Sequence, residues 1–163
     1  MSVGTMDELL LDELKDLCSA EKQITQSLPR LAKAATSLEL KQAFESHLEE
    51  TKGQIQRLDR ALKTLGKSGK GKKCHGMEGV LGEGSEVLKE TAKRSVRDAA
   101  LISAAQSVEH YEMAGYGCVR EYAQILAQKE IASLLDATLK EEEVAGKKLG
   151  MIAKKVNMAA KTA

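Results

Sequence analysis

Acidic side chains recur at positions where a helix would place its apolar face. In SVEHYEMAGY, residues 107–116, Glu109 and Glu112 continue a stripe of apolar residues spaced three and four apart. Three other segments carry an acid in the same kind of stripe, at Glu21, Glu50 and Glu142. Carboxylate oxygens are the ligands that hard divalent cations prefer. These five acids are therefore candidate metal ligands.

The charge of these acids also favours bound metal ions. A buried, ionised carboxylate without a partner costs several kcal/mol, and five of them would exceed the roughly 5–15 kcal/mol that stabilises a domain. No Lys or Arg falls in the same register near them. Two divalent cations would supply four positive charges. The alternative is that each acid lies at the edge of its stripe and reaches water, but the agreement of four segments favours the metal site.

The distance of each acid from the predicted turns indicates a common height. Glu21 lies about fifteen residues before a turn near 36, and Glu50 about fourteen after it, so a helical hairpin brings them level at about 1.5 Å per residue. A turn near 128 brings Glu142 level with a point near Glu112. We expect all five acids to meet at the middle of a bundle.

Two histidines and a tyrosine accompany the acids. His47, one turn before Glu50, is either a ligand or a hydrogen-bonded core histidine. His110 lies one residue off the inward stripe, which places it behind the ligands or on the surface. Tyr116, one turn beyond Glu112, either packs in the core or supports the site by hydrogen bonding or redox chemistry.

The composition predicts an all-α protein. The chain has 163 residues with 2% aromatics and one proline, it is rich in helix formers, and no alternating run indicates a strand. We expect a single domain over residues 1–163. Its predicted helices cover about 6–35, 37–65, 77–92 (weak, with internal glycines), 96–127 and 130–157. Their predicted starts follow three capping pairs: Thr5 with Glu8, Thr36 with Glu39, and Ser95 with Asp98.

The long connection between the two hairpins suggests a particular bundle. About thirty residues, including the weak short helix, could run the length of the molecule, which predicts a ferritin-like four-helix bundle with a long crossover between helices two and three. An up-down-up-down bundle is the alternative.

Several other classes of function find no support. The net charge of +1 implies neither nucleic acid nor membrane as a partner, and no apolar run is long enough to span a bilayer. We expect a cytoplasmic chain. The three cysteines, an odd number, predict no disulfide framework. Cys18 and Cys118 are predicted to be buried. Cys74 beside His75 is a candidate metal ligand or exposed thiol, although two ligands are too few for a zinc site.

Several segments resemble the YciE/YciF family of ferritin-like bacterial stress proteins, and YciF more closely. The matching segments are DELKDLCSAEKQ, HLEETKGQI, KKCHGMEG, VRDAALISAAQSVEHYEMAGYG and TLKEEE. The resemblance implies a rubrerythrin-like four-helix bundle, a homodimer, a dinuclear metal site and ferroxidase-type activity.

The resemblance also assigns the ligands. The metal-binding glutamates of the ferritin-like pattern fall on Glu21, Glu50, Glu109, Glu112 and Glu142. Two histidines of that pattern are missing, because Gly53 and Ala145 stand three residues after Glu50 and Glu142. His47 is a candidate replacement. We expect two divalent ions, iron first, with manganese as the alternative in such an oxygen-rich site.

Three functional hypotheses follow. The first is oxidation of ferrous iron by oxygen or peroxide, in protection against oxidative stress. The second is a non-catalytic stress-response dimer with a vestigial or structural metal site and a protein partner. The third is thiol redox chemistry at Cys74.

Overall fold

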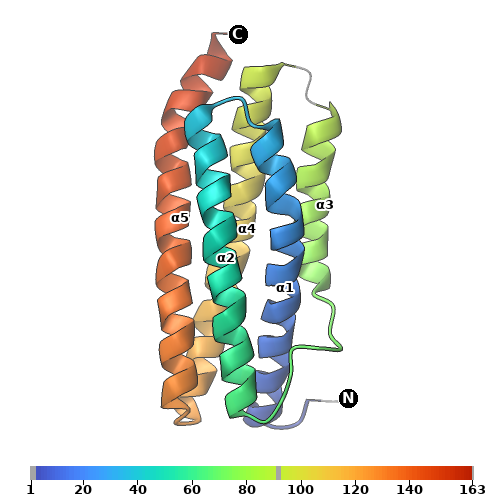
Figure 1. Cartoon of the computed structure of the whole chain (residues 1–163), viewed down its shortest axis with the longest axis vertical. Coiled ribbons are helices and arrows are strands. Elements are labelled where there is room, and N and C mark those ends of the chain that lie inside the picture. The colour runs from blue at the N-terminus through green and yellow to red at the C-terminus, as the bar shows by residue number, and fades with distance from the viewer. Residues whose placement is uncertain (1–2, 91–92, 163) are drawn as a thin grey trace.

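The computed structural model describes residues 3–90 and 93–162, and these form five α-helices and no strand. The helices are α1 (Met6–Ala34), α2 (Leu38–Thr64), α3 (His75–Glu90), α4 (Arg94–Ile125) and α5 (Lys129–Lys161). The prediction of an all-α chain is confirmed. Four long helices form a bundle, and the shorter α3 lies outside it against α1 and α4 (Figure 1).

The direction of the helices decides between the two predicted bundles. The start of α4 contacts the turn between α1 and α2, because Asp98 of α4 accepts hydrogen bonds from Thr36 and Ser37. The chain therefore travels from the far end of α2 back along the whole bundle before α4 begins (Figure 1). An up-down-up-down bundle would start α4 at the opposite end. The ferritin-like arrangement with a long crossover is the correct one.

The crossover is fastened to α1 and α4. The backbone N–H of Cys74 donates to the Ser19 hydroxyl at 2.9 Å, and the Gln23 amide donates to the Cys74 carbonyl at 3.0 Å. The Cys74 thiol lies 3.1 Å from the Tyr111 hydroxyl. A side chain at Gly76 would collide with this tyrosine, since its Cβ would overlap the hydroxyl oxygen. These contacts hold α3 along the bundle.

Several predicted helix ends were wrong. The predicted helix 77–92 begins at His75, two residues early, and residues 91 and 92 lie outside the described residues. The predicted helix 96–127 is Arg94–Ile125, and no side chain caps its start. The last helix continues to Lys161 instead of ending near 157. Ala159 and Ala160 have high helix propensity, which favours this extension of the helix.

The predicted capping pairs had different outcomes. Thr5 and Glu8 form the capping box that was expected at the start of α1. At α2 the cap is Ser37 and not Thr36. Asp98 does not cap its own helix with Ser95, because its carboxylate faces the α1–α2 turn. Local sequence spacing could not reveal a partner that is more than sixty positions away.

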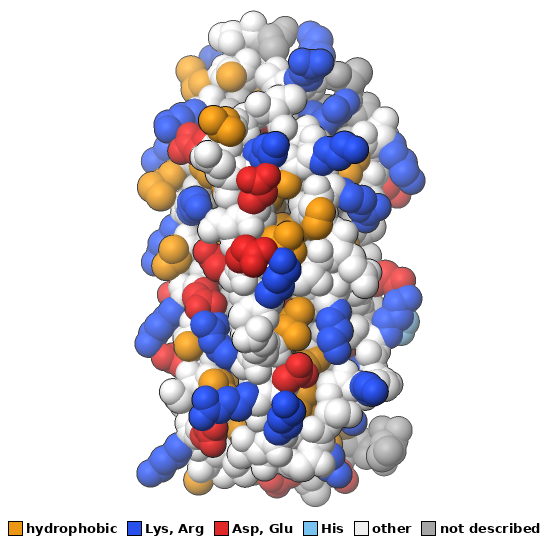
Figure 2. All heavy atoms as spheres, in the orientation of Figure 1, with side chains coloured by type: hydrophobic (Ala, Val, Ile, Leu, Met, Phe, Trp, Pro, Cys, Tyr) orange, Lys and Arg blue, Asp and Glu red, His pale blue; other side chains and the backbone are white. Residues whose placement is uncertain are grey.

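Figure 2 shows basic and acidic side chains interspersed over the face formed by α5, α2 and α1. No helix within residues 3–90 and 93–162 has an apolar stretch long enough to traverse a lipid bilayer.

Asp98 generates a prediction for stability. Replacing the buried Asp98 with alanine would remove the charged acceptor of three hydrogen bonds from Thr36 and Ser37, which should lower the free energy of unfolding by about 1–3 kcal/mol. Thermal unfolding followed by circular dichroism measures this loss. The exposed Asp7→Ala variant is the control, and an equal melting temperature for the two variants would contradict the role of Asp98.

Candidate metal centre

A layer of polar side chains divides the core at the middle of the bundle. One apolar cluster, with Leu28, Phe44 and Ile152, lies on one side, and a second, with Leu14, Leu58 and Ile131, lies on the other. The polar residues between them are all buried: Glu21, His47, Thr51, Gln54, Glu109, Glu112, Thr138 and Glu142. Each of the four long helices contributes to the layer.

Four of these residues form a tight quartet. His47, Glu109, Glu112 and Glu142 each offer one ligand atom, and the four atoms all lie within 4.8 Å of one another. The His47 Nε2 atom is 3.4 Å from a Glu109 oxygen and 3.9 Å from a Glu142 oxygen. The structure thus contains a buried His/Glu cluster that could hold a metal ion.

Glu21 joins the layer from α1. Its Oε1 atom accepts a hydrogen bond from the Tyr116 hydroxyl, and its Oε2 atom is buried without a hydrogen-bond partner. The side chains of Glu21 and Glu112 also interact. Tyr116 therefore has both roles considered from the sequence: it is fully buried among apolar residues and it holds an acid of the layer.

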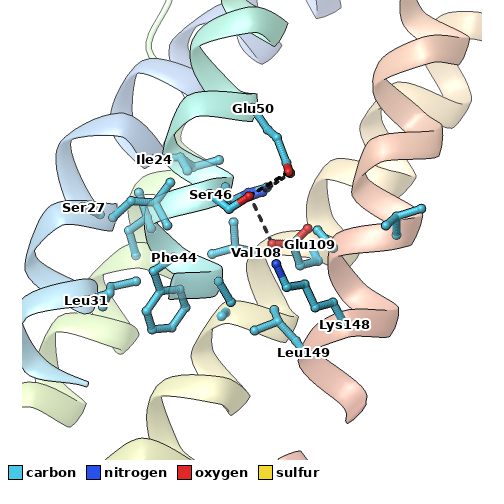
Figure 3. Close-up of a pocket in the computed structure, with 17 residues that line it drawn as sticks. Ile24, Ser27, Leu31, Phe44, Ser46, Glu50, Val108, Glu109, Lys148 and Leu149 are labelled. Atoms are coloured by element: carbon cyan, nitrogen blue, oxygen red, sulfur yellow. Dashed lines mark hydrogen bonds and ion pairs between the residues drawn. The ribbon is translucent and has the colours of Figure 1, made fainter. Parts of the chain in front are cut away.

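Glu50 and His110 lie elsewhere. The Glu50 side chain is 43% exposed, accepts a hydrogen bond from Ser46, and lies 3.6 Å from His47 Nδ1. His47 takes the buried position on this face of α2, whereas Glu50 lies toward solvent. Figure 3 shows Glu50 on α2 beside Ser46. His110 was expected behind the ligands or on the surface. It is exposed, and its Nδ1 atom bonds the Gln106 carbonyl of its own helix at 2.7 Å.

A second group of polar residues, not predicted from the sequence, lies beside the quartet. The Gln54 amide donates to Glu142, and at 3.2 Å to Glu141. Arg57 forms an ion pair with the same Glu141 and donates to Thr138. Gln54 follows His47 and Glu50 in the same helical stripe, and this was the one available signal. The hydrogen bond from Gln54 orients the Glu142 carboxylate.

Burial sets the protonation of the acids in the metal-free protein. It raises the pKa of Glu21 to about 7, against the hydrogen bond from Tyr116. Burial, followed by repulsion from Glu109, raises the pKa of Glu142 to about 10. Glu112 has a pKa well above its usual value because of burial and its acidic neighbours. Without a cation, the layer keeps protons on carboxylates at neutral pH.

His47 and Glu50 shift in the opposite sense to the buried acids. Burial lowers the pKa of His47, but the Glu50 carboxylate, 3.6 Å from Nδ1, and the charge of Glu109 outweigh it and raise the pKa. The same contact with His47 lowers the pKa of Glu50. Both shifts favour an ion pair between these two residues.

The unsatisfied atoms of the layer test whether metal ions fit it. Both oxygens of Glu112, one oxygen each of Glu21, Glu109 and Glu142, and both ring nitrogens of His47 are buried without a hydrogen-bond partner. In the described part of the chain, the ion pairs of these buried acids go to His47 and to no lysine or arginine. Such unpaired atoms are rare in folded proteins. They fit divalent cations with oxygen ligands and one imidazole.

The cysteines do not form a second centre. Cys74, predicted as an exposed thiol, is buried, and burial together with Asp16 raises its pKa. A protonated, enclosed thiol is a poor nucleophile. Cys18 is buried as expected, whereas Cys118 is exposed, contrary to the prediction, because the inward positions near it belong to Tyr116 and Val119.

Comparisons with known proteins give consistent results. The family model described as "Domain of unknown function (DUF892)" matches residues 5–161. Protein YciF of Escherichia coli (strain K12) is 45% identical over 150 residues, which cover 91% of this chain and 90% of that protein. The crystal structure of the E. coli stress protein YciF superposes with a TM-score of 0.91 at 44% identity, covering 94% of this chain and 98% of that one. YcfI from Rhodopseudomonas palustris superposes with a TM-score of 0.89 at 42% identity, over 91% and 95% of the two chains.

The raised pKa values predict how stability depends on pH. The folded, metal-free protein binds protons at Glu21, Glu112 and Glu142 that the unfolded chain has lost, so its stability should fall as the pH rises from 5 to 8. Glu21 alone, shifted from 4.5 to about 7, corresponds to roughly 3 kcal/mol. Melting temperatures in a chelator across this range measure the effect.

Divalent cations provide the matched comparison for this experiment. A bound cation takes the place of the protons, so manganese(II) should raise the melting temperature most at pH 8 and least at pH 5. A chelated protein that is as stable at pH 8 as at pH 5 would contradict the raised pKa values.

Proposed function

The chain belongs to the DUF892 family, and from that premise we propose that it is a ferritin-like stress protein that oxidises ferrous iron with oxygen or peroxide. The activity would remove iron and oxidant together during oxidative stress. The relative from E. coli is described as a stress protein. The observation that carries the proposal is the buried layer of carboxylates with unsatisfied oxygen atoms and no basic partner among the described residues other than His47.

We assign the binding of two divalent ions to the residues of this layer. Glu109, Glu112, Glu142 and His47 offer ligand atoms within one small volume. Glu21 faces the same layer and is oriented by the Tyr116 hydroxyl. Glu50 lies outside, next to His47, and would need a different side-chain rotamer to become a ligand. The assignment of the five glutamates as ligands therefore stays a prediction.

The chemistry requires two ferrous ions, each of which supplies one electron. With hydrogen peroxide the balance is 2 Fe²⁺ + H₂O₂ + 2 H⁺ → 2 Fe³⁺ + 2 H₂O. Glu112 and Glu142 hold protons while the layer is free of metal and lose them when a cation binds. The apolar clusters on both sides of the layer exclude water, which would limit the release of reactive oxygen species.

The donor set bears on the choice of metal. Position 53 is glycine with open space around it, and position 145 is alanine, so neither supplies the imidazole of the ferritin-like pattern. His47 is the one imidazole in the layer. A harder, oxygen-rich site favours manganese more than a site with two histidines would. Iron remains the proposed substrate, and manganese is the alternative occupant.

An exposed apolar stripe supports the second candidate function. Val144, Met151 and Met158 are spaced seven residues apart on α5 and are 62–63% exposed. Large apolar residues in a row on a surface favour an interaction with another protein. We propose that two copies of the chain pair over this stripe, which sedimentation velocity of the purified protein would test. In the second candidate function, the metal site is structural and this same surface binds a partner protein.

Glu112 distinguishes catalysis from a structural role. The Glu112→Leu variant removes a carboxylate whose two oxygens have no partner, so the metal-free protein should become more stable by about 1–3 kcal/mol. Its rate of ferrous iron oxidation, measured as oxygen or peroxide consumption, should nevertheless fall by about a hundredfold because a ligand is lost. The exposed Glu83→Leu variant is the control.

The two measurements together exclude misfolding as the cause of a lost activity. Equal oxidation rates for the wild type and Glu112→Leu would remove the enzymatic proposal and leave the structural candidate.

A further inference from the structure

A cavity of about 110 Å³ lies beside the quartet. Most of its lining is apolar and comes from the cluster that contains Leu28, Leu31, Phe44, Val108 and Leu149. The helices of the bundle supply these walls, and α3 contributes Leu81. An apolar cavity offers water few hydrogen-bond partners and favours a ligand with a carbon skeleton.

One side of the cavity is the metal centre itself. His47 and Glu109 of the quartet form part of its lining, together with Glu50 and Lys148. Figure 3 shows Glu109 and Lys148 on one side of the cavity, with Leu31 and Phe44 on the opposite side. A molecule with an apolar body and a polar end would therefore place its polar end against the ligands of the centre.

The size of the cavity limits its occupant. An engineered apolar cavity of about 150 Å³ binds benzene, so a cavity of about 110 Å³ suits an alkyl group of roughly four carbons. Three alanines, Ala43, Ala105 and Ala145, keep this space open. Any larger side chain at these positions would enter it.

The charges at the polar side limit the occupant further. Two acids, Glu50 and Glu109, stand there with two bases, His47 and Lys148, and His47 pairs with Glu50. This side therefore offers no excess of positive charge to hold a carboxylate head, such as that of a fatty acid. A neutral head group that donates and accepts hydrogen bonds fits these neighbours.

From this juxtaposition of an apolar cavity and the quartet we infer that the oxidant is a small organic hydroperoxide, whose alkyl group occupies the cavity and whose hydroperoxide group faces His47 and Glu109. The inference rests on the proposed function, because it names the oxidant of that reaction. The O–O bond breaks, two ferrous ions supply the two electrons, and two protons complete the products: 2 Fe²⁺ + ROOH + 2 H⁺ → 2 Fe³⁺ + ROH + H₂O.

The kinetic test compares two oxidants on the same protein. Ferrous-loaded wild type is mixed with tert-butyl hydroperoxide or with hydrogen peroxide, and ferric iron is followed by absorbance. Ala43→Leu and Leu81→Trp fill the cavity from two different helices, α2 and α3. In both, the ratio of kcat/KM for tert-butyl hydroperoxide to that for hydrogen peroxide should fall by at least about tenfold, since the alkyl group loses its apolar site. Ala137→Leu, at an exposed position of α5, should keep the wild-type ratio.

A binding test needs no iron. tert-Butanol, the alcohol product, is added to the metal-free protein, and saturation-transfer NMR detects contact with it. The wild type and Ala137→Leu should give a signal, and Ala43→Leu and Leu81→Trp should lose it. Circular dichroism reports whether each variant is folded. Leu81 is only partly buried, so Leu81→Trp carries the test if Ala43→Leu does not fold.

The outcomes separate the two proposals. If hydrogen peroxide oxidises iron normally but tert-butanol does not bind, or the ratio is unchanged in the filled variants, the organic oxidant is wrong and the proposed function stands. If neither peroxide oxidises iron on the wild type, the proposed function and this inference both fail.

Discussion

The burial of carboxylates without basic partners is the constraint on which the rest of this structure depends. Glu21, Glu109, Glu112 and Glu142 lie in a layer from which solvent is almost absent. Desolvation favours the protonated forms of Glu21, Glu112 and Glu142, and only cations could return these three to the charged state. A layer of this kind opposes folding, so the apolar clusters on both sides of it must offset its cost. The protein thus maintains an unfavourable core layer, which is typical of a site kept for function.

The crossover makes this layer possible. Because the chain returns along the whole bundle before α4 begins, α1 lies antiparallel to α4, and α2 lies antiparallel to α5. Acids at similar distances from the two hairpin turns then meet at one height. Asp98 fixes the start of α4 against the α1–α2 turn, and the contacts of Cys74 fix the crossover beside α1 and α4. Each fastening sets the level at which Glu109 and Glu112 reach the core.

Regular features of the sequence predicted most of the fold and the position of the layer. Helical periodicity and the distance from each turn were sufficient to bring Glu21, Glu109, Glu112 and Glu142 together, because both follow from helix geometry. The orientation of Glu50 could not be predicted, since His47 competes with it for the inward position. Gln54 and Asp98 depend on partners distant in the sequence, which no local pattern reveals. The cavity exists because small side chains on three different helices line the same space, and no pattern within one helix indicates such a coincidence.

The central claim is that cations hold this layer together, and anomalous diffraction from crystals grown with manganese(II) tests it most directly. Manganese stands in for ferrous iron without being oxidised during the experiment. The account predicts two anomalous peaks inside the bundle, within bonding distance of oxygens from Glu109, Glu112 and Glu142. Peaks confined to surface acids, with the buried carboxylates left as they are in the metal-free protein, would contradict it.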